Sequence, residues 1–257
     1  LALREPVDHA ARNQDIISAL KENFKEKTEL AITDIGSGTG STIRALKPAL
    51  DKKINWHLID YDDALIEVAK KEAGSDNVEF TLADLSKALD SIFSNAPDLI
   101  TTSAFLDLVS SDWLEWLVNE VTARNLPFYA AITYDGRAGC APKFKADQDV
   151  IEAFNMHQKT DKGFGPALGP DAADTAIKLF ENAGYKVQSG QSDWQGTHKH
   201  KEFQKMLLDG WKIAASEIEP EQKQAFDEWL TDRNTLIHNG IGSLFVGHKD
   251  FIAFPKG

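Results

Sequence analysis

Three glycines fall within five positions, at 36, 38 and 40, in the stretch AITDIGSGTGSTIRAL (31–46). Glycine loses more backbone freedom on folding than other residues, so a cluster is costly unless the chain must turn tightly or a ligand must approach the main chain. The cluster follows an apolar run, 30–36, and precedes the periodic segment STIRALKPAL. We interpret it as the turn between a buried strand and a helix, whose amino terminus offers free N–H groups to a polar ligand.

Short apolar runs alternate with helix-patterned segments along the first half of the chain. This alternation is typical of βαβ units and predicts a doubly wound, mostly parallel sheet. An amphipathic helix is expected over 6–26. In the second half, Gly and Pro gather at 159–171, between further helical segments. Strands are expected at 30–36, 54–62, 77–85, the start of 97–109, 127–136, 185–194 and 242–255.

The amino-acid composition limits the kinds of molecule that this protein is expected to bind. The net charge of −12 disfavours a general nucleic-acid binder, which normally carries a basic face, so a small-molecule substrate is favoured. The single cysteine, Cys140, excludes an internal disulfide. No apolar stretch approaches the ~20 residues that a membrane helix needs, and we expect a cytoplasmic protein without a membrane partner. His198 and His200 lack metal-like spacing, so no metal is expected.

The spacing of the glycines distinguishes between the known classes of nucleotide-binding loop. The dinucleotide fingerprint is G-x-G-x-x-G/A, whereas here the third glycine, Gly40, comes one position early. The phosphate-binding G-x-x-x-x-G-K-[ST] pattern is absent: counted from Gly38, Ile43 and Arg44 stand where Gly and Lys would be. Asp60 ends the second expected strand, 20 residues after Gly40, where a carboxylate can accept both hydroxyls of a ribose. Dehydrogenases use the same device, so Asp60 alone leaves both classes open.

Four features in order resemble the class I methyltransferases: Gly-x-Gly-x-Gly after Asp34, then Asp60, then Asp84 in TLADLS, and the loop SAFLDLV. The resemblance covers about residues 30–136 and implies S-adenosylmethionine as cofactor. It implies an α/β fold with a seven-stranded, mostly parallel sheet, helices on both faces, an antiparallel C-terminal strand, an N-terminal helix and helical elaborations near the C-terminus. We expect one domain, 1–257, with a cofactor-binding core at 30–136 and acceptor-side elaborations at 137–240.

The resemblance also implies roles for individual residues. Ser103 would lie under the reacting sulfonium, and Tyr61 would pack beside the adenine. Simpler interpretations stay open: Asp34 braces the glycine turn, Asp84 caps the next helix, and Tyr61 is a surface aromatic. The remaining implied contacts are Asp34, Gly36, Ser37, Gly38 and Gly40 with the methionine moiety, Asp60 with the ribose, and Ala83, Asp84 and Leu85 with the base.

The acceptor is less constrained by the sequence. The chain lacks the Asn/Asp-Pro-Pro-Tyr/Phe signature of amino methyltransferases acting on nucleic acids and some proteins, and Cys140 does not match the Pro-Cys nucleophile of pyrimidine enzymes. Tyr134 and Asp135 end the fifth expected strand, where ligands bind in this fold. The stretch NMHQKTDKGFGPALG is expected to form a lid or acceptor wall, with His157 as general base. The alternative is that His157 only ends a helix favourably.

These features predict an enzyme that transfers a methyl group to oxygen or nitrogen of a small molecule by in-line displacement. Two other hypotheses stay open: a non-catalytic S-adenosylmethionine-binding subunit or sensor, and a methyltransferase for protein or RNA. Self-association into a homodimer also stays open.

Overall fold

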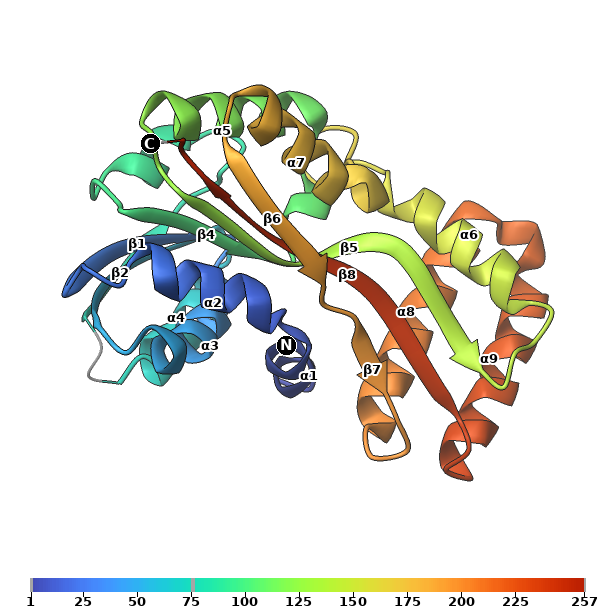
Figure 1. Ribbon diagram of the computed structural model, residues 1–257. Helices are drawn as coiled ribbons and strands as arrows, with labels where there is room; N and C mark the ends of the chain where they lie inside the picture. Colours follow the sequence, from blue (N-terminus) through green and yellow to red (C-terminus); the bar gives the residue numbers. More distant parts are fainter. Residues whose placement is uncertain (1, 75–76, 257) are drawn as a thin grey trace.

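A single mixed β-sheet organises the protein (Figure 1). The computed structural model describes residues 2–74 and 77–256, and within them the sheet has eight strands in the order β3-β2-β1-β4-β5-β8-β6, with β7 paired to β8. The strands are β1 (Glu29–Ile35), β2 (Lys53–Asp60), β3 (Asn77–Leu82), β4 (Leu99–Ser103), β5 (Phe128–Ala141), β6 (Lys186–Gln191), β7 (Trp194–Gly196) and β8 (Ser243–Phe254).

The pairing confirms the expected α/β architecture. Strands β1 to β5 pair in parallel, whereas β8 runs antiparallel to β5, β6 and β7. The C-terminal apolar run therefore forms the antiparallel strand that the resemblance implied. The segment expected as one strand over 185–194 is divided into β6 and the start of the short β7, which adds one strand to the seven expected.

Helices cover both faces of the sheet (Figure 1). One apolar cluster joins α2, α3 and β1 through Leu20, Leu46 and Ile32, and a second joins α5 and α7 through Leu114 and Phe180. The described helices are α1 (Glu5–Ala11), α2 (Gln14–Asn23), α3 (Ser41–Leu50), α4 (Asp63–Glu72), α5 (Ser111–Ala123), α6 (Asp147–Gln158), α7 (Ala172–Asn182), α8 (Lys201–Ile218) and α9 (Lys223–His238).

The N-terminal segment forms two helices rather than the single helix expected over 6–26. Arg12 adopts an extended conformation with ψ 132°, and the side chain of Asn13 accepts hydrogen bonds from the N–H groups of Asp15 and Ile16 as the N-cap of α2. The N–H of Asn13 donates to Asp250 of β8 at 2.9 Å. A long-range contact and a local cap thus break a segment whose apolar spacing alone suits one helix.

Strands β5 and β8 continue beyond the parallel core and carry a helical elaboration of α6, α8 and α9 (Figure 1). Register shifts between Ala130 and Thr133 and between Tyr134 and Ala138 interrupt the β5–β8 ladder, and such irregularities bend a strand. Arg233 of α9 donates to both carboxylate oxygens of Asp147 of α6, and Trp229 donates to the same carboxylate at 2.8 Å. This buried ion pair joins the two helices.

Candidate active site

The glycine turn after β1 brings bare main chain against an aromatic ring. Gly36 has φ +63°, and a Cβ at this position would lie 2.5 Å from Cδ2 of Phe105, which follows β4. Gly40 is the N-cap of α3 with φ +76°, a conformation that residues with a side chain rarely adopt. Both glycines are therefore required by the turn itself, and Gly36 also lets Phe105 approach the main chain.

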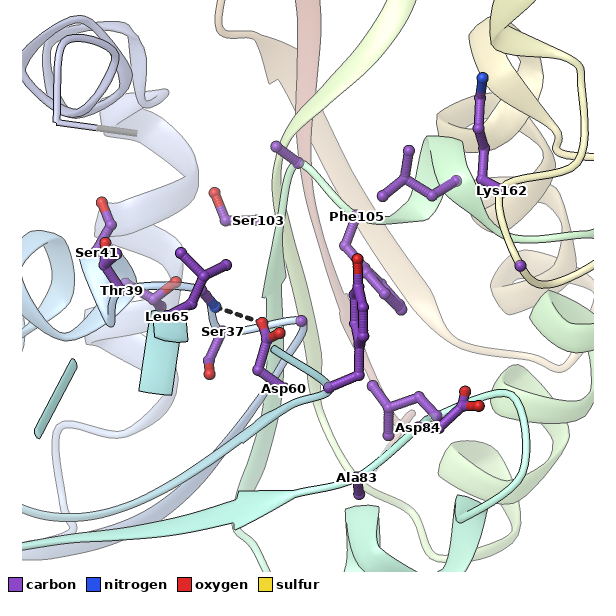
Figure 2. Close-up of a pocket in the computed structure, with 18 of the residues that line it drawn as sticks. Ser37, Thr39, Ser41, Asp60, Leu65, Ala83, Asp84, Ser103, Phe105 and Lys162 are labelled. Atoms are coloured by element: carbon purple, nitrogen blue, oxygen red, sulfur yellow. Dashed lines mark hydrogen bonds between the residues drawn. The ribbon is translucent and has the colours of Figure 1, made fainter. Parts of the chain in front are cut away.

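Asp60 is held rigidly at the end of β2. Its Oδ2 accepts the N–H of Gly38 at 2.7 Å, the bond drawn dashed in Figure 2, and its Oδ1 accepts the N–H of Asp62 at 3.0 Å. The residue is 6% exposed. Each carboxylate oxygen offers about two lone pairs, so each can still accept a hydrogen bond from a ligand. The hydrogen bond from Gly38 holds the turn after β1 against the end of β2, so the two strand ends form one continuous surface.

A cavity of about 600 Å³ lies over this surface. That volume is within the ~300–1,000 Å³ usual for pockets that bind small molecules or cofactors. In Figure 2, Ser103 lies on one side of Asp60 and Ala83 on the other, so the cavity passes across the ends of neighbouring strands. The predicted residues that line it are Gly36, Ser37, Gly38, Asp60, Tyr61, Ala83, Asp84, Leu85 and Ser103.

The segment after β3 forms one end of the cavity. Asp84 accepts hydrogen bonds from the N–H and the hydroxyl of Ser86 and pairs with Lys87 at 2.7 Å. The bond with Lys87, followed by those with Ser86, lowers the pKa of Asp84 to about 2. The carboxylate therefore shapes the turn after β3 and lines the cavity. It does not cap the next helix, because the N-cap of the 3-10 helix Leu89–Phe93 is Ala88. Tyr61 also lines the cavity and is 78% exposed.

Asp34 and Gly40 do not line the cavity within the described part of the chain. Asp34 is fully buried, and its Oδ1 accepts the hydroxyl of Thr101 at 2.8 Å. Burial raises the pKa of Asp34 to about 7. The position beneath the turn, on the strand that leads into it, agrees with the simpler interpretation that Asp34 braces the turn.

Ser103 connects the cavity to a buried polar network. Its hydroxyl accepts a hydrogen bond from Arg12 at 3.3 Å, and Arg12 also donates to the hydroxyl of Tyr129 at 3.3 Å. Arg12 is 3% exposed, although it lies in the break between α1 and α2. The N-terminal segment is thereby anchored directly under the Ser103 end of the cavity.

The three residues expected to be catalytic do not line the cavity within the described residues, which corrects the expected arrangement. The Tyr134 hydroxyl donates to Asn155 at 2.6 Å, because the side chain packs inward beside α6. Asp135 pairs with Arg137 at 2.6 Å, and His157 pairs with Glu217 of α8 at 3.0 Å. Tyr134 and His157 are engaged with α6 and α8, and Asp135 is engaged with Arg137 of its own strand, so the geometry gives no support to catalytic roles for them.

Two distant segments complete the cavity and were only partly anticipated. Lys162, Gly163 and Phe164 line it from the Gly/Pro-rich loop, as expected for a lid or acceptor wall. Arg4 and Asp8 line it from the start of the chain. The sequence signal for Asp8 was weak, since a lone carboxylate on an amphipathic helix is usually solvated. The other lining residues are Glu5, Thr39, Ser41, Thr42, Leu65, Ser86, Lys87, Ala104, Phe105 and Leu108.

Comparisons with known proteins agree with this geometry. Residues 32–124 match a family model described as a methyltransferase domain. The fold is similar to that of the YcgJ protein from Bacillus subtilis (TM-score 0.56, 15% identity, covering 95% of this chain and 100% of that one). It is also similar to a putative methyltransferase from Bacillus halodurans (TM-score 0.54, 13% identity, covering 94% and 100%). No curated protein gives a significant match.

The strand order, the glycine turn and Asp60 define the class I methyltransferase fold with its cofactor crevice. Together with the family match, they identify residues 32–124 as the methyltransferase domain of an enzyme. Among the described residues, no helix is both long and apolar enough to cross a membrane.

Proposed function

We propose that the cavity over the strand ends binds S-adenosylmethionine and that the enzyme methylates oxygen or nitrogen of a small-molecule acceptor. The observation that carries this proposal is the Asp60 carboxylate, fixed by two backbone N–H groups and facing a cavity of about 600 Å³. Its remaining lone pairs suit the two hydroxyls of a ribose. The methionine part would lie along Gly36, Ser37 and Gly38, toward Ser103.

The adenine would occupy the opposite end, near Ala83 and Leu85. Asp84 would receive the adenine amino group, and Tyr61 would cover the ring from the rim. When bound, S-adenosylmethionine supplies a methyl group on a positively charged sulfur, which is an activated leaving group. The protein's main task is then to align the acceptor behind that methyl group. Arg4 and Lys162 line the cavity from two separate segments, which supports a small acceptor enclosed within it.

Replacement of Asp60 tests the cofactor site. We expect Asp60→Ala to weaken S-adenosylmethionine binding at least about tenfold, because charged hydrogen bonds are worth ~1.5–3 kcal/mol. Asp63→Ala, which removes an exposed carboxylate from the first turn of α4, is the matched control and should leave affinity unchanged. Isothermal titration calorimetry measures both. Equal affinity of Asp60→Ala and the wild type would remove Asp60 from the site.

A further inference from the structure

Arg4, directly before α1, carries a guanidinium with unused hydrogen-bonding capacity. Its Nε donates to Oδ2 of Asp8 at 3.1 Å, whereas its two terminal nitrogens have no hydrogen-bond partner among the described residues. The side chain of Arg4 is 29% exposed and lines the cavity. A guanidinium presents its N–H donors in a fixed planar fork, so the donors on the terminal nitrogens are left for a ligand.

Two contacts hold this guanidinium in place. Asp8 is 4% exposed and fixes the Nε edge, and Cζ of Arg4 lies 5.5 Å from the centroid of the Trp194 ring in β7. Trp194 is itself buried and packs against His248 of β8, with 4.3 Å between the ring centroids. An arginine that is already fixed loses less side-chain freedom when it binds a ligand, which favours affinity.

The direction of Arg4 separates it from the side of α1 that faces the glycine turn. Successive residues of a helix point about 100° apart, so Arg4 and Asp8 share a face that differs from the face of Glu5 and His9. Glu5 and His9 contact α3, which begins at the glycine turn. Arg4 instead contacts β7, which follows the matched methyltransferase domain in the chain. Arg4 is therefore directed toward the C-terminal elaboration.

A second cation lines the cavity from another segment. Lys162 belongs to the Gly/Pro-rich loop, and Figure 2 shows it beyond Phe105, on the side away from Ser41. Its Nζ donates to the hydroxyl of Thr160 at 2.9 Å and lies 3.3 Å from Nδ1 of His157, but it pairs with no carboxylate among the described residues. The charge of Lys162 therefore favours an anion in the cavity.

The Arg4–Asp8 pair also leaves one acceptor unused. Oδ1 of Asp8 is sealed from solvent and has no hydrogen-bond partner in the described part of the chain, and Asp8 lines the cavity. Buried acceptors without a donor are rare and costly, so a ligand group that donates an O–H or N–H to Oδ1 is favoured. The two members of the pair thus call for different groups: an oxyanion for Arg4, and a hydroxyl or amine for Asp8.

We propose that Arg4 binds the carboxylate of the methyl acceptor and that Asp8 accepts a hydrogen bond from its hydroxyl or amino group, so the acceptor is a small hydroxy acid or amino acid. This inference rests on the proposed function, because the acceptor must reach the methyl group of the cofactor in the same cavity. The fork of an arginine matches the two oxygens of a carboxylate in spacing, so the contact is bidentate. Lys162 adds positive charge without fixing the orientation of the anion.

Matched acids and amides test this subsite without knowledge of the natural acceptor. Glycolate and mandelate are hydroxy acids of two sizes, and glycolamide and mandelamide are their uncharged counterparts. The wild-type enzyme is first saturated with S-adenosylhomocysteine, the form of the cofactor that remains after methyl transfer. We expect it to bind at least one acid about fivefold or more tightly than the matching amide, because charged hydrogen bonds are stronger than neutral ones. Ligand-observed NMR measures such weak affinities.

Substitutions of Arg4 assign this preference to the fork. Arg4→Gln and Arg4→Lys should each bring the ratio close to one, since lysine keeps the charge beside Asp8 but lacks the fork. Arg124→Gln, which breaks an exposed ion pair on α5, should keep the wild-type ratio. Acetate, which lacks the hydroxyl, should bind the wild type about threefold or more weakly than glycolate, and equal binding would remove Asp8 from the subsite.

The cofactor carries a carboxylate of its own, so its binding is measured in the same variants. We expect Arg4→Lys to leave unchanged the affinity for S-adenosylhomocysteine and for 5′-methylthioadenosine, which lacks the amino-acid part. Weaker binding of S-adenosylhomocysteine alone would assign Arg4 to the cofactor and overturn the acceptor subsite. A wild-type ratio near one for both acids, or a ratio that survives both Arg4 substitutions, would also overturn it. Failure of the wild type to bind S-adenosylhomocysteine would instead refute the proposed function.

Discussion

At the scale of single residues, the contact between Gly36 and Phe105 decides the form of the glycine turn after β1. The glycine has φ +63°, and the ring occupies the volume of its missing Cβ. Two separate costs therefore oppose a side chain here: the left-handed backbone and the collision with the ring.

Gly36→Ala should destabilise the protein more than a positive φ alone explains. Gly240 is the matched control, because it has φ +73° and, among the described residues, nothing within 4 Å of its missing Cβ. We expect Gly240→Ala to cost about 1–2 kcal/mol, the usual penalty for a left-handed residue. Gly36→Ala should cost about 1–3 kcal/mol more, as overpacking does. Chemical denaturation measures both, and equal costs would mean that Phe105 moves aside freely.

At the scale of elements, α1 covers the cavity through contacts at its own ends. Glu5 accepts two hydrogen bonds from Arg44 of α3, at 2.5 and 2.8 Å, and Nε2 of His9 lies 3.0 Å from the hydroxyl of Ser41. The helix has only seven residues, too few to be stable alone. Its position therefore depends on these contacts and on burial of Val7 and Asp8.

Glu5→Gln should loosen α1 without unfolding the sheet. The pair is partly exposed, so we expect a local loss of at most about 1 kcal/mol, or roughly fivefold faster exchange of the α1 amide hydrogens. Hydrogen exchange followed by mass spectrometry measures it. Glu67→Gln, which breaks an exposed ion pair with Lys70 on α4, should leave α1 unaffected. Unchanged α1 exchange in Glu5→Gln would show that apolar burial alone holds the helix.

The stability of α1 in its position over the cavity should also depend on pH. Hydrogen bonds from Arg44 lower the pKa of Glu5 from its ordinary value of 4.5. A carboxyl with a lowered pKa in the folded state contributes stability that is present above the ordinary value and lost as the pH falls through the folded value. We expect the protection of α1, corrected for intrinsic exchange, to be constant above about pH 5 and to fall below about pH 4.5. Glu5→Gln should lack this transition, and its persistence there would assign it to another group.

At the scale of the whole molecule, the buried pair Asp147–Arg233 attaches α9 to α6 beside the extended β5 and β8. The Arg233 side chain is 3% exposed. Arg233→Ala should destabilise by about 3–5 kcal/mol, because it leaves a buried carboxylate without its cation. For a chain of this size that lowers the melting temperature by roughly 6–20 °C. Lys223→Ala, which breaks an exposed pair with Asp227 on the same helix, should change it little. Equal effects in calorimetric melting would refute a structural role for the buried pair.

Much of the fold was predictable because its signals are local. Apolar periodicity and the glycine turn indicated the alternating strands and helices of the core. Asp60 was located from its position at a strand end, and Ser103 was implied by the family resemblance. Parallel strands align their carboxyl ends at one edge, so residues far apart in sequence could be expected to face one cavity.

Tertiary structure decided what depends on contacts between distant segments. The break between α1 and α2 at Arg12 depends on hydrogen bonds to Ser103 and Asp250. The position of the His157 side chain depends on its ion pair with Glu217 of α8. Asp8 lines the cavity only because α1 packs against α3. The sequence alone determined the fold class and the cofactor side of the site, because local spacing encodes a strand, a turn and a helix. The residues on the acceptor side of the cavity were decided by the packing of segments that lie far apart in the sequence, and no local sequence pattern shows that these segments meet.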